Sequence, residues 1–305
     1  MKRVTFFVFA FLICSTSLAQ EGPKRPPIWG IGSVSIVLNG NPEFYNKQLG
    51  LEEQAEFCLG GCITRFGISP HQRLELLDGS PADPVTLKRI EGSLVWVTFE
   101  TSDIKMLRWY LESRKLRTTE IMASDPASAD PQFSIQDPEG HHIRFIEFTG
   151  KDHYKHNDVQ VSAHLIHAGF VVHDRAAEDK FYKDVLGFHV YWHGGMKEGE
   201  DNWVDMQVPD GTDWIEYMLK VPENATHKQL GVMNHIALGV PDIHAAREQL
   251  VKNGWKGTEE PKIGRDGKWQ LNLYDPDETR VEFTEFTPTK EPCCSPYTGP
   301  HPGSK

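Results

Sequence analysis

The chain has 305 residues, 39% of them hydrophobic and 25% charged, and it is long enough to bury one large core or two medium ones. It carries 43 acidic against 32 basic residues, which gives a formal net charge of −11. This acidic balance argues against nucleic acid or an anionic membrane as a partner, because both bind basic patches.

The first 19 residues are typical of a secretory signal peptide. Lys2 and Arg3 form a basic start, residues 4–14 are an almost unbroken apolar run, and residues 17–19 offer small side chains for cleavage. The apolar run is well short of the roughly 20 residues that cross a bilayer, which disfavours a membrane anchor. We therefore expect an exported protein, periplasmic or secreted, with no membrane attachment after cleavage.

Two segments, 28–150 and 164–288, repeat one sequence pattern at a shift of about 138 residues. The recurring pieces are an aromatic pair, an Asp-Ile pair and an Asp-Pro pair: Phe44–Tyr45 with Phe181–Tyr182, Asp103–Ile104 with Asp242–Ile243, and Asp137–Pro138 with Asp275–Pro276. The repeat predicts an N-terminal and a C-terminal domain of the same fold.

Within the second copy, a strand, a helix and further strands occur in that order twice, with three strands after the first helix and two after the second. Asp174 and Asp242 are typical N-caps of helices that end at Gly187 and Gly254. The expected strands are rich in hydrophobic residues and span 167–172, 189–192, 203–208, 214–219, 235–240, 269–274 and 279–286. A lone unit cannot cover both sides of its small sheet, so the units must pair. The expected fold class is α+β, with four βαβββ units in the chain.

Residues 289–305 are rich in Pro, Gly and Ser and are typical of an irregular tail. Four cysteines remain after signal cleavage: Cys58, Cys62, Cys293 and Cys294. An oxidising compartment permits two disulfides in any of three pairings, and the sequence leaves the pairing open. A thiolate metal site is the alternative. The adjacency of the second pair in a Pro-rich tail favours a structural role or idle thiols.

The two copies differ at positions that suit a metal. When the two copies are aligned, His235 and Glu282 of the second correspond to Trp96 and Arg144 of the first. His167 opens the second copy, where the first has only a glycine-flanked stretch around residue 32. Imidazoles with carboxylates favour a divalent transition metal (Fe, Mn, Co, Ni or Zn) over Ca. We expect one metal site, in the second copy, and a first copy that has lost it.

Alternation along the strands limits which side chains converge. Trp214 and Glu216 share one face of their strand, and Tyr217 points to the other. Glu282 and Glu285 are an odd number of residues apart and face oppositely. Only one of these two carboxylates can point into a shared cavity.

The chain resembles the vicinal oxygen chelate superfamily, which includes glyoxalase I, bleomycin and fosfomycin resistance proteins, methylmalonyl-CoA epimerase and type I extradiol dioxygenases. The resemblance rests on four segments, HAGFVV, FYKDVLGF, NHIALGVPDI and LNLYDPDETRVEFTEF, and with weaker N-terminal counterparts it covers roughly residues 30–288. It implies paired βαβββ units curved into two cup-shaped, open barrels. It also implies a metal and a small-molecule substrate.

The resemblance further implies roles for particular residues. The metal ligands common to the family fall on His167, His235 and Glu282, and in the glyoxalase and epimerase branches a fourth ligand falls on Glu216. Glu216 or Glu282 would then also serve as the catalytic base. The candidates for lining the substrate mouth are Tyr191, His193, Trp214 and Tyr217. A turn, 265–268, offers cations to an anionic substrate.

Ligand count separates the two main reactions. Four protein ligands leave room for one substrate bound through two oxygens, which suits proton transfer, whereas three leave room for a catecholate and dioxygen. Glu216 favours the first reaction, and the two-domain plan favours the second. Extradiol enzymes also carry an acid–base His before the second ligand, and here only His227 lies there, in a Pro- and Asn-containing segment.

A glyoxalase- or epimerase-like lyase or isomerase is therefore the favoured function. An extradiol ring-cleaving dioxygenase is the first alternative, and a non-catalytic binding or resistance protein is the second. The sequence leaves open whether the protein is a monomer or a homodimer, because an internal duplication can replace the dimer that single-domain relatives need.

Overall fold

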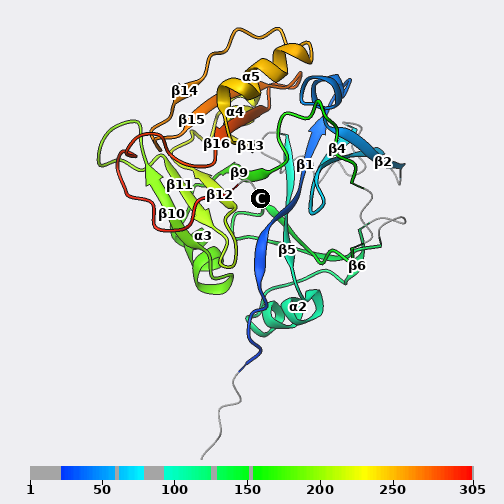
Figure 1. Ribbon diagram of the computed structural model, residues 1–305. Helices are drawn as coiled ribbons and strands as arrows, with labels where there is room; N and C mark the ends of the chain where they lie inside the picture. The colour runs from blue at the N-terminus through cyan, green and yellow to red at the C-terminus, as the bar shows by residue number, and fades with distance from the viewer. Residues whose placement is uncertain (1–21, 59–61, 79–92, 125–128, 151–153, 304–305) are drawn as a thin grey trace, which may run out of the picture.

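The computed structural model describes residues 22–58, 62–78, 93–124, 129–150 and 154–303 (Figure 1). The expected signal peptide, 1–19, lies outside these residues. Within them, no helix combines the length and the apolar character needed to cross a membrane.

The described part of the chain forms two eight-stranded sheets. The first has the strand order β2-β3-β4-β1-β5-β8-β7-β6. Its strands are β1 (Ile28–Leu38), β2 (Glu52–Cys58), β3 (Cys62–Ser69), β4 (Gln72–Asp78), β5 (Leu94–Thr101), β6 (Met122–Ala123), β7 (Pro131–Gln136) and β8 (His142–Ile146).

The second sheet repeats that order as β10-β11-β12-β9-β13-β16-β15-β14. Its strands are β9 (Leu165–Val171), β10 (His189–Gly194), β11 (Trp203–Gln207), β12 (Trp214–Met218), β13 (His235–Val240), β14 (Lys262–Ile263), β15 (Trp269–Tyr274) and β16 (Arg280–Glu285). The helical segments are η1 (Phe44–Gln48), α2 (Ile104–Ser113), α3 (Arg175–Asp179), η2 (Lys180–Val185), α4 (His227–Met233) and α5 (Ile243–Lys252), of which η1 and η2 are π-helices.

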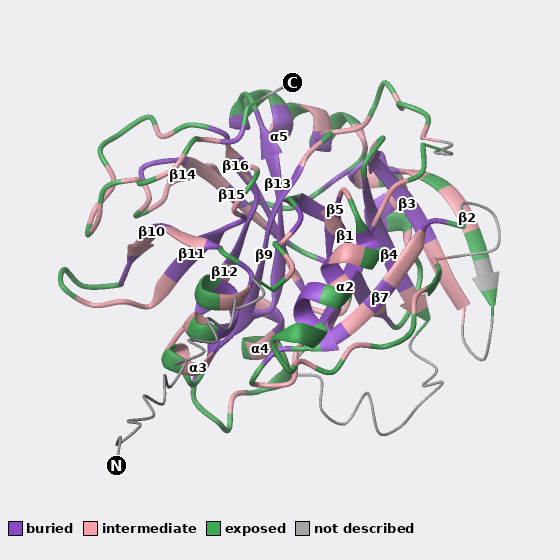
Figure 2. Ribbon diagram, turned by 90° about the horizontal axis from the view of Figure 1, so that it is seen from below, coloured by how far each residue is buried: buried purple, intermediate pink, exposed green. Residues whose placement is uncertain are grey.

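Each sheet is built from two βαβββ units and is curled into a half-barrel (Figure 1). The expected α+β class with four such units is confirmed. Figure 2 shows the buried residues, in purple, concentrated along the strands. The first strand of each unit in the second half, β9 and β13, is buried along its whole length.

The helices begin and end where local chemistry dictates. The Asp242 side chain caps α5 by accepting hydrogen bonds from the N–H groups of His244 and Ala245. The helix buries Ile243, Ala246 and Leu250 against the sheet, and Gly254, with φ of 94°, allows the chain to turn away. The expected caps are confirmed, since Asp174 likewise accepts from the N–H of Ala177.

Two reciprocal hydrogen bonds join the halves. The Tyr45 hydroxyl, from η1 of the first half, donates to Asp275 of the second at 2.7 Å. The Tyr182 hydroxyl, from η2 of the second half, donates to Asp137 of the first at 3.2 Å. Both acceptors belong to the repeated Asp-Pro turns, so the sequence repeat is also a pseudo-symmetric contact between the halves.

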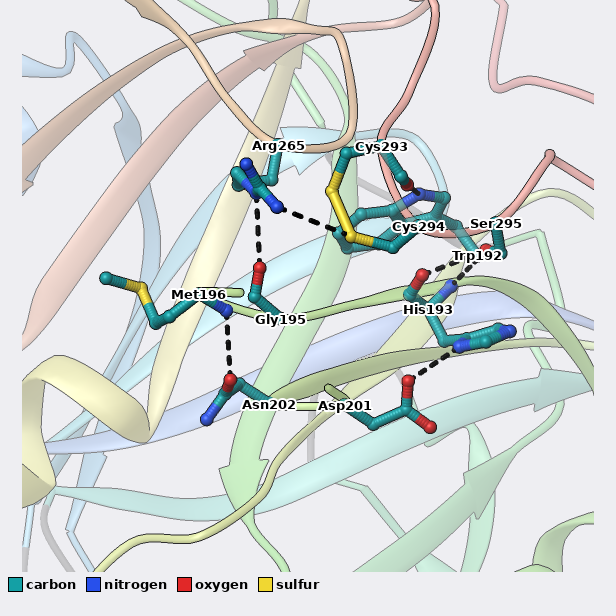
Figure 3. Close-up of a disulfide and its surroundings, with 10 residues drawn as sticks. All are labelled: Trp192, His193, Gly195, Met196, Asp201, Asn202, Arg265, Cys293, Cys294 and Ser295. Atoms are coloured by element: carbon teal, nitrogen blue, oxygen red, sulfur yellow. Dashed lines mark hydrogen bonds and ion pairs between the residues drawn. A yellow bond between two sulfur atoms is a disulfide. The ribbon is translucent and has the colours of Figure 1, made fainter. Parts of the chain in front are cut away.

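The tail after β16 is irregular, as expected, but it is hydrogen-bonded to the second sheet (Figure 3). The Cys293 N–H donates to the Arg265 carbonyl at 2.8 Å, and the Trp192 indole N–H donates to the Cys293 carbonyl at 3.1 Å. The His193 N–H donates to Ser295 Oγ at 3.0 Å. The tail thus bridges the edge strand β10 and the β14–β15 turn, and it closes the open side of the half-barrel.

Within the described residues two disulfides are present, Cys58–Cys62 and Cys293–Cys294. Of the three possible pairings, the structure contains the one between sequence neighbours. Each of the four sulfurs is bonded to the other sulfur of its pair, so no free thiolate is left among them for a metal site.

Candidate metal centre

Four adjacent strands, β12, β9, β13 and β16, carry the expected ligands. His167, Glu216 and Glu282 line one cavity, and His235 is buried next to Glu216. Glu216 of β12 is in register with Gly169 of β9, which is in register with His235 of β13. The next row, two residues along, carries His167 and Glu282. Residues in one row, or two residues along a strand, lie on the same face of the sheet. Register therefore brings four residues from distant parts of the chain to one place.

Three of these side chains meet. His167 Nε2 and His235 Nε2 are 3.1 Å apart. Glu216 Oε2 lies 3.1 Å from His235 Nε2 and 3.8 Å from His167 Nε2. One ligand atom from each residue lies within 4.8 Å of the others, and both imidazoles are buried.

The chemistry of this donor set fits a divalent transition metal. Burial holds the pKa of His167 and of His235 well below the usual value, so both rings are neutral at physiological pH. His235 Nδ1 donates to the Met233 carbonyl at 2.8 Å, which leaves a lone pair on Nε2. His167 Nδ1 is buried without a hydrogen-bond partner among the described residues, and the ring is held by packing against Trp214, with 4.9 Å between the ring centres.

Glu282 lines the same cavity but lies outside the group of three. Its Oε2 atom is 3.8 Å from Arg280 Nη1. Burial raises the pKa of Glu282 to about 8, against the lowering effect of Arg280. Burial likewise raises the pKa of Glu216 to about 7. Glu285 faces away and accepts a hydrogen bond from the Ile243 N–H at the start of α5, as the alternation of the strand requires.

Arg280 is a site residue that the sequence reasoning missed. Its Nη2 atom donates to His235 Nε2 at 2.6 Å and lies 3.8 Å from Glu216 Oε2. The available signal was its spacing, two residues before Glu282 on the same strand face. A guanidinium at this point occupies the lone pair that a metal would use.

Replacing Arg280 by Met is expected to tighten metal binding roughly tenfold, because one charge-assisted hydrogen bond to His235 no longer competes with the ion. The measurement is a competition titration with a chelating dye. Arg265→Met removes another cation of the cavity wall that is not in contact with the ligands, and it should leave the affinity unchanged. Weaker binding in Arg280→Met would mean that Arg280 orients the carboxylates instead of competing with the metal.

The cavity beside these residues has a volume of about 340 Å³. Three tryptophans line it, Trp192, Trp203 and Trp214, together with the cations Lys262 and Arg265. A partly apolar cavity of this size with a few charged groups is typical of a small-molecule site.

Of the four residues expected at the substrate mouth, one lines the cavity and three lie elsewhere. Trp214 lines the cavity, and Tyr191, His193 and Tyr217 do not. Tyr217 faces the opposite side of β12 and packs in the core against Phe170. Tyr191 is buried under the tail, where its hydroxyl contacts His301, and His193 bonds Asp201 at 2.7 Å. Tyr217 lies outside the cavity because strand alternation points it to the other face of β12. Tyr191 lies outside it because the tail covers this residue, and no signal in the sequence indicated that coverage.

Gly169 stands between Glu216 and His235, and a side chain there would disturb the site. A Cβ atom on Gly169 would lie 2.0 Å from His235 Cε1, closer than atoms can approach. Gly169→Ala is therefore expected to displace the His235 ring and weaken metal binding by at least roughly tenfold. The measurement is the dissociation constant of the metal.

Gly239→Ala is the matched control for this variant, because its Cβ would lie 2.4 Å from Phe286 Cε1, on a strand of the same sheet but away from the ligands. It should lower thermal stability while metal affinity is retained. Equal affinities for all three proteins would show that Gly169 does not position His235.

The first sheet has no imidazole at the corresponding places. Strand register gives the counterparts as Ser33 for His167, Glu75 for Glu216, Trp96 for His235 and Arg144 for Glu282. For the counterpart of His167, the sequence alone indicated a stretch around residue 32, and the strand register identifies Ser33.

Arginines compensate the retained carboxylate in the first sheet. Glu75 accepts hydrogen bonds from Arg144 and from Arg65, each at 3.1 Å, and from Ser35 Oγ at 2.7 Å. The Arg144 guanidinium also lies 4.8 Å from the centre of the Trp96 ring. Burial raises the pKa of Glu75, but Arg144 and Arg65 outweigh it and keep the pKa below its usual value. A guanidinium here takes the charge-compensating place that a metal would have.

Sequence comparison agrees with the geometry of the second half. Residues 164–283 match the Glyoxalase/Bleomycin resistance protein/Dioxygenase superfamily. A lactoylglutathione lyase of Haemophilus influenzae is 29% identical over 128 residues, which are 41% of this chain and 95% of that protein.

Solved structures with the same fold span most of both halves. Homoprotocatechuate 2,3-dioxygenase from Brevibacterium fuscum, in complex with 3,4-dihydroxyphenylacetate, has a TM-score of 0.61 and 19% identity, and covers 86% of this chain and 82% of its own. The 2,3-dioxygenase LapB from Pseudomonas sp. KL28 has a TM-score of 0.62 and 16% identity, and covers 92% of this chain and 96% of its own. At this level of identity the likeness shows a shared fold.

Proposed function

The second half of the chain belongs to the Glyoxalase/Bleomycin resistance protein/Dioxygenase superfamily, and from this we propose that the protein is a divalent-metal-dependent lyase or isomerase of the glyoxalase or epimerase type. The observation that carries the proposal is the meeting of His167, Glu216 and His235 within 4.8 Å. Glu282 adds a second carboxylate in the same cavity. Two imidazoles and two carboxylates suit Fe, Mn, Co, Ni or Zn.

A bound metal supplies Lewis-acid polarisation of two neighbouring oxygens of the substrate. The residues of the chain do the remaining work. His167, His235 and Glu216 would hold the ion. Glu282 is the better placed general base, because its carboxylate lines the cavity outside the group of three. Its carboxylate would take a proton from a substrate carbon and return it to a neighbouring atom.

The walls of the cavity indicate the kind of substrate. A volume of about 340 Å³ accommodates a small molecule. Lys262 and Arg265 offer positive charge to an anionic group, and the three tryptophans offer apolar surface. We propose a small, anionic substrate chelated through two neighbouring oxygens. All the residues involved come from one chain, so the proposal requires no second copy.

An extradiol dioxygenase is the second candidate, because the solved structures that resemble both halves are dioxygenases. Among the described residues, however, the cavity wall contains no His besides the expected ligand His167, and no Tyr. His227, the candidate for the additional acid–base His, is the exposed first residue of α4, where its Nε2 lies 3.3 Å from the Asp277 carbonyl. Neither His227 nor the described lining of the cavity supplies a further His for that role, because His167 is itself an expected ligand.

Metal analysis and two assays test the proposal. The purified protein should contain a stoichiometric transition metal and convert the hemithioacetal of methylglyoxal and glutathione, or exchange its carbon-bound proton with deuterated water. Oxygen uptake with catechol or 3,4-dihydroxyphenylacetate should be absent. Metal-dependent oxygen uptake would replace this proposal by the dioxygenase one, and a metal-free protein would favour the binding function.

We also propose that the protein is exported. The basic and apolar segment 1–19 supports this. The two disulfides agree with an oxidising compartment. Fractionation of producing cells, followed by N-terminal sequencing, should find a periplasmic or secreted chain without its first residues. A full-length cytoplasmic chain would contradict export.

A further inference from the structure

A second group of metal-ligating side chains lies where the two halves meet. Asp137 and His141 belong to the turn between β7 and β8, and Glu178 belongs to α3 of the other half. One ligand atom from each lies within 4.8 Å of the others. Asp137 and Glu178 are buried, and His141 is partly exposed beside a small cavity.

The carboxylate oxygens of this group divide into two kinds. Asp137 Oδ1 accepts backbone hydrogen bonds from Glu139 and His141, and Glu178 Oε1 accepts from the Glu139 N–H at 3.0 Å. Asp137 Oδ2 lies 2.7 Å from His141 Nδ1 and accepts a hydrogen bond from the Tyr182 hydroxyl. Glu178 Oε2 is fully buried and has no hydrogen-bond partner among the described residues. Backbone groups thus fix one side of each carboxylate, and the other side is directed inward.

The group has more negative charge than its surroundings compensate. Glu178 forms no ion pair with a Lys or Arg in the described part of the chain. Burial, followed by the charge of Asp137, raises the pKa of Glu178 to about 9. A buried carboxylate in such a position must either take up a proton or acquire a cation.

The pseudo-symmetric contact shows that the fold does not require this group. At the equivalent point of the other half, the shift of about 138 residues places Asp275 for Asp137, Thr279 for His141 and Asn41 for Glu178. The Tyr45–Asp275 hydrogen bond is formed there at 2.7 Å without a His or a second carboxylate. Joining of the halves therefore explains the aspartate and the tyrosine, but it does not explain His141 and Glu178.

We propose that Asp137, His141 and Glu178 form a second divalent-cation site, of the zinc class, which ties α3 of one half to the β7–β8 turn of the other. One imidazole and two carboxylates are ligands that Zn²⁺ accepts, and the imidazole disfavours Ca²⁺ and Mg²⁺. The ion binds His141 Nδ1, Asp137 Oδ2 and Glu178 Oε2. Its role is structural, because it joins segments about 40 residues apart, across the boundary between the halves.

Zinc binding to the full-length, tag-free protein tests the site independently of the proposed enzyme function. In the His167→Ala/His235→Ala background, which removes the first site, one zinc per chain should still bind and raise the melting temperature. Adding His141→Ala should weaken this binding by at least roughly tenfold. His142→Ala, which changes the neighbouring His outside the group, is the matched control and should retain it.

If the double variant does not fold, the zinc content of otherwise unmodified protein answers the same question, and His141→Ala should contain one ion fewer. Glu178→Gln separates a cation from a shared proton. A cation site loses zinc in Glu178→Gln as it does in His141→Ala. Binding that His141→Ala and Glu178→Gln leave unchanged, or no zinc beyond the first ion, overturns the proposal. The first site can fail its own tests while this one passes, and the reverse also holds.

Discussion

For the proposed metal-dependent enzyme, His235→Ala is expected to remove the bound metal and to lower kcat/KM by at least roughly a thousandfold. The imidazole lies 3.1 Å from each of its partner ligands, so its loss removes the donor that is closest to both of the others. Several kcal/mol of transition-state stabilisation depend on the ion, and each 1.4 kcal/mol is tenfold in rate. Metal content and steady-state rates of the purified variant are the measurements.

His227→Ala is the matched control for this prediction, because His227 is exposed at the start of α4 and does not line the cavity. This variant should keep its metal and its rate. Full metal content and full rate in His235→Ala would remove the basis of the enzyme proposal. A large fall in rate with His227→Ala, with metal retained, would point back to the dioxygenase.

Arg144→Met is expected to lower the free energy of unfolding by about 3 kcal/mol. Removing one partner of a buried ion pair typically costs about 3–5 kcal/mol, because the other charge stays buried and uncompensated. The lower end applies here, since Arg65 still contacts Glu75 at 3.1 Å. Denaturant unfolding followed by circular dichroism measures the change.

Two further variants test whether burial of the Arg144–Glu75 ion pair causes this loss of stability. Arg108→Met breaks the exposed pairs of Arg108 with Glu112 and Glu120 in the same half, and it should cost less than about 1 kcal/mol. Arg144→Met combined with Glu75→Gln should lose less stability than Arg144→Met alone, because no carboxylate is then left without its partner. An equal loss for Arg108→Met and Arg144→Met would contradict the buried-pair account.

The two halves place positive charge against the same strand carboxylate in different ways. In the first half Arg144 donates to Glu75 at 3.1 Å. In the second, Arg280 lies 3.8 Å from Glu216, and imidazoles complete a set suited to an exchangeable ion. A carboxylate buried in a curled sheet requires a counter-charge in either case. Among the described residues, the second half places imidazole nitrogens beside it, and the first half places guanidinium groups there.

The order of the elements was predictable because its signals are local. The Asp N-caps and the strand alternation act over a few residues, and both appear in the structure as expected. The repeat was readable for the same reason, since aligned short motifs need no knowledge of contacts. The elements α4 and β14 were not predicted at all, because short elements leave too few residues for a pattern.

The sequence by itself determined the four-unit α+β architecture, the pairing of two similar halves and the residue types of the candidate centre. Tertiary structure decided which of them meet. It placed Arg280 on the lone pair of His235, moved Tyr191 beneath the tail and gathered Asp137, His141 and Glu178 at the junction of the halves. The physical reason is that a strand's own pattern specifies only which face a side chain takes. Its neighbours depend on the register with strands far away in the sequence and on the curl of the sheet.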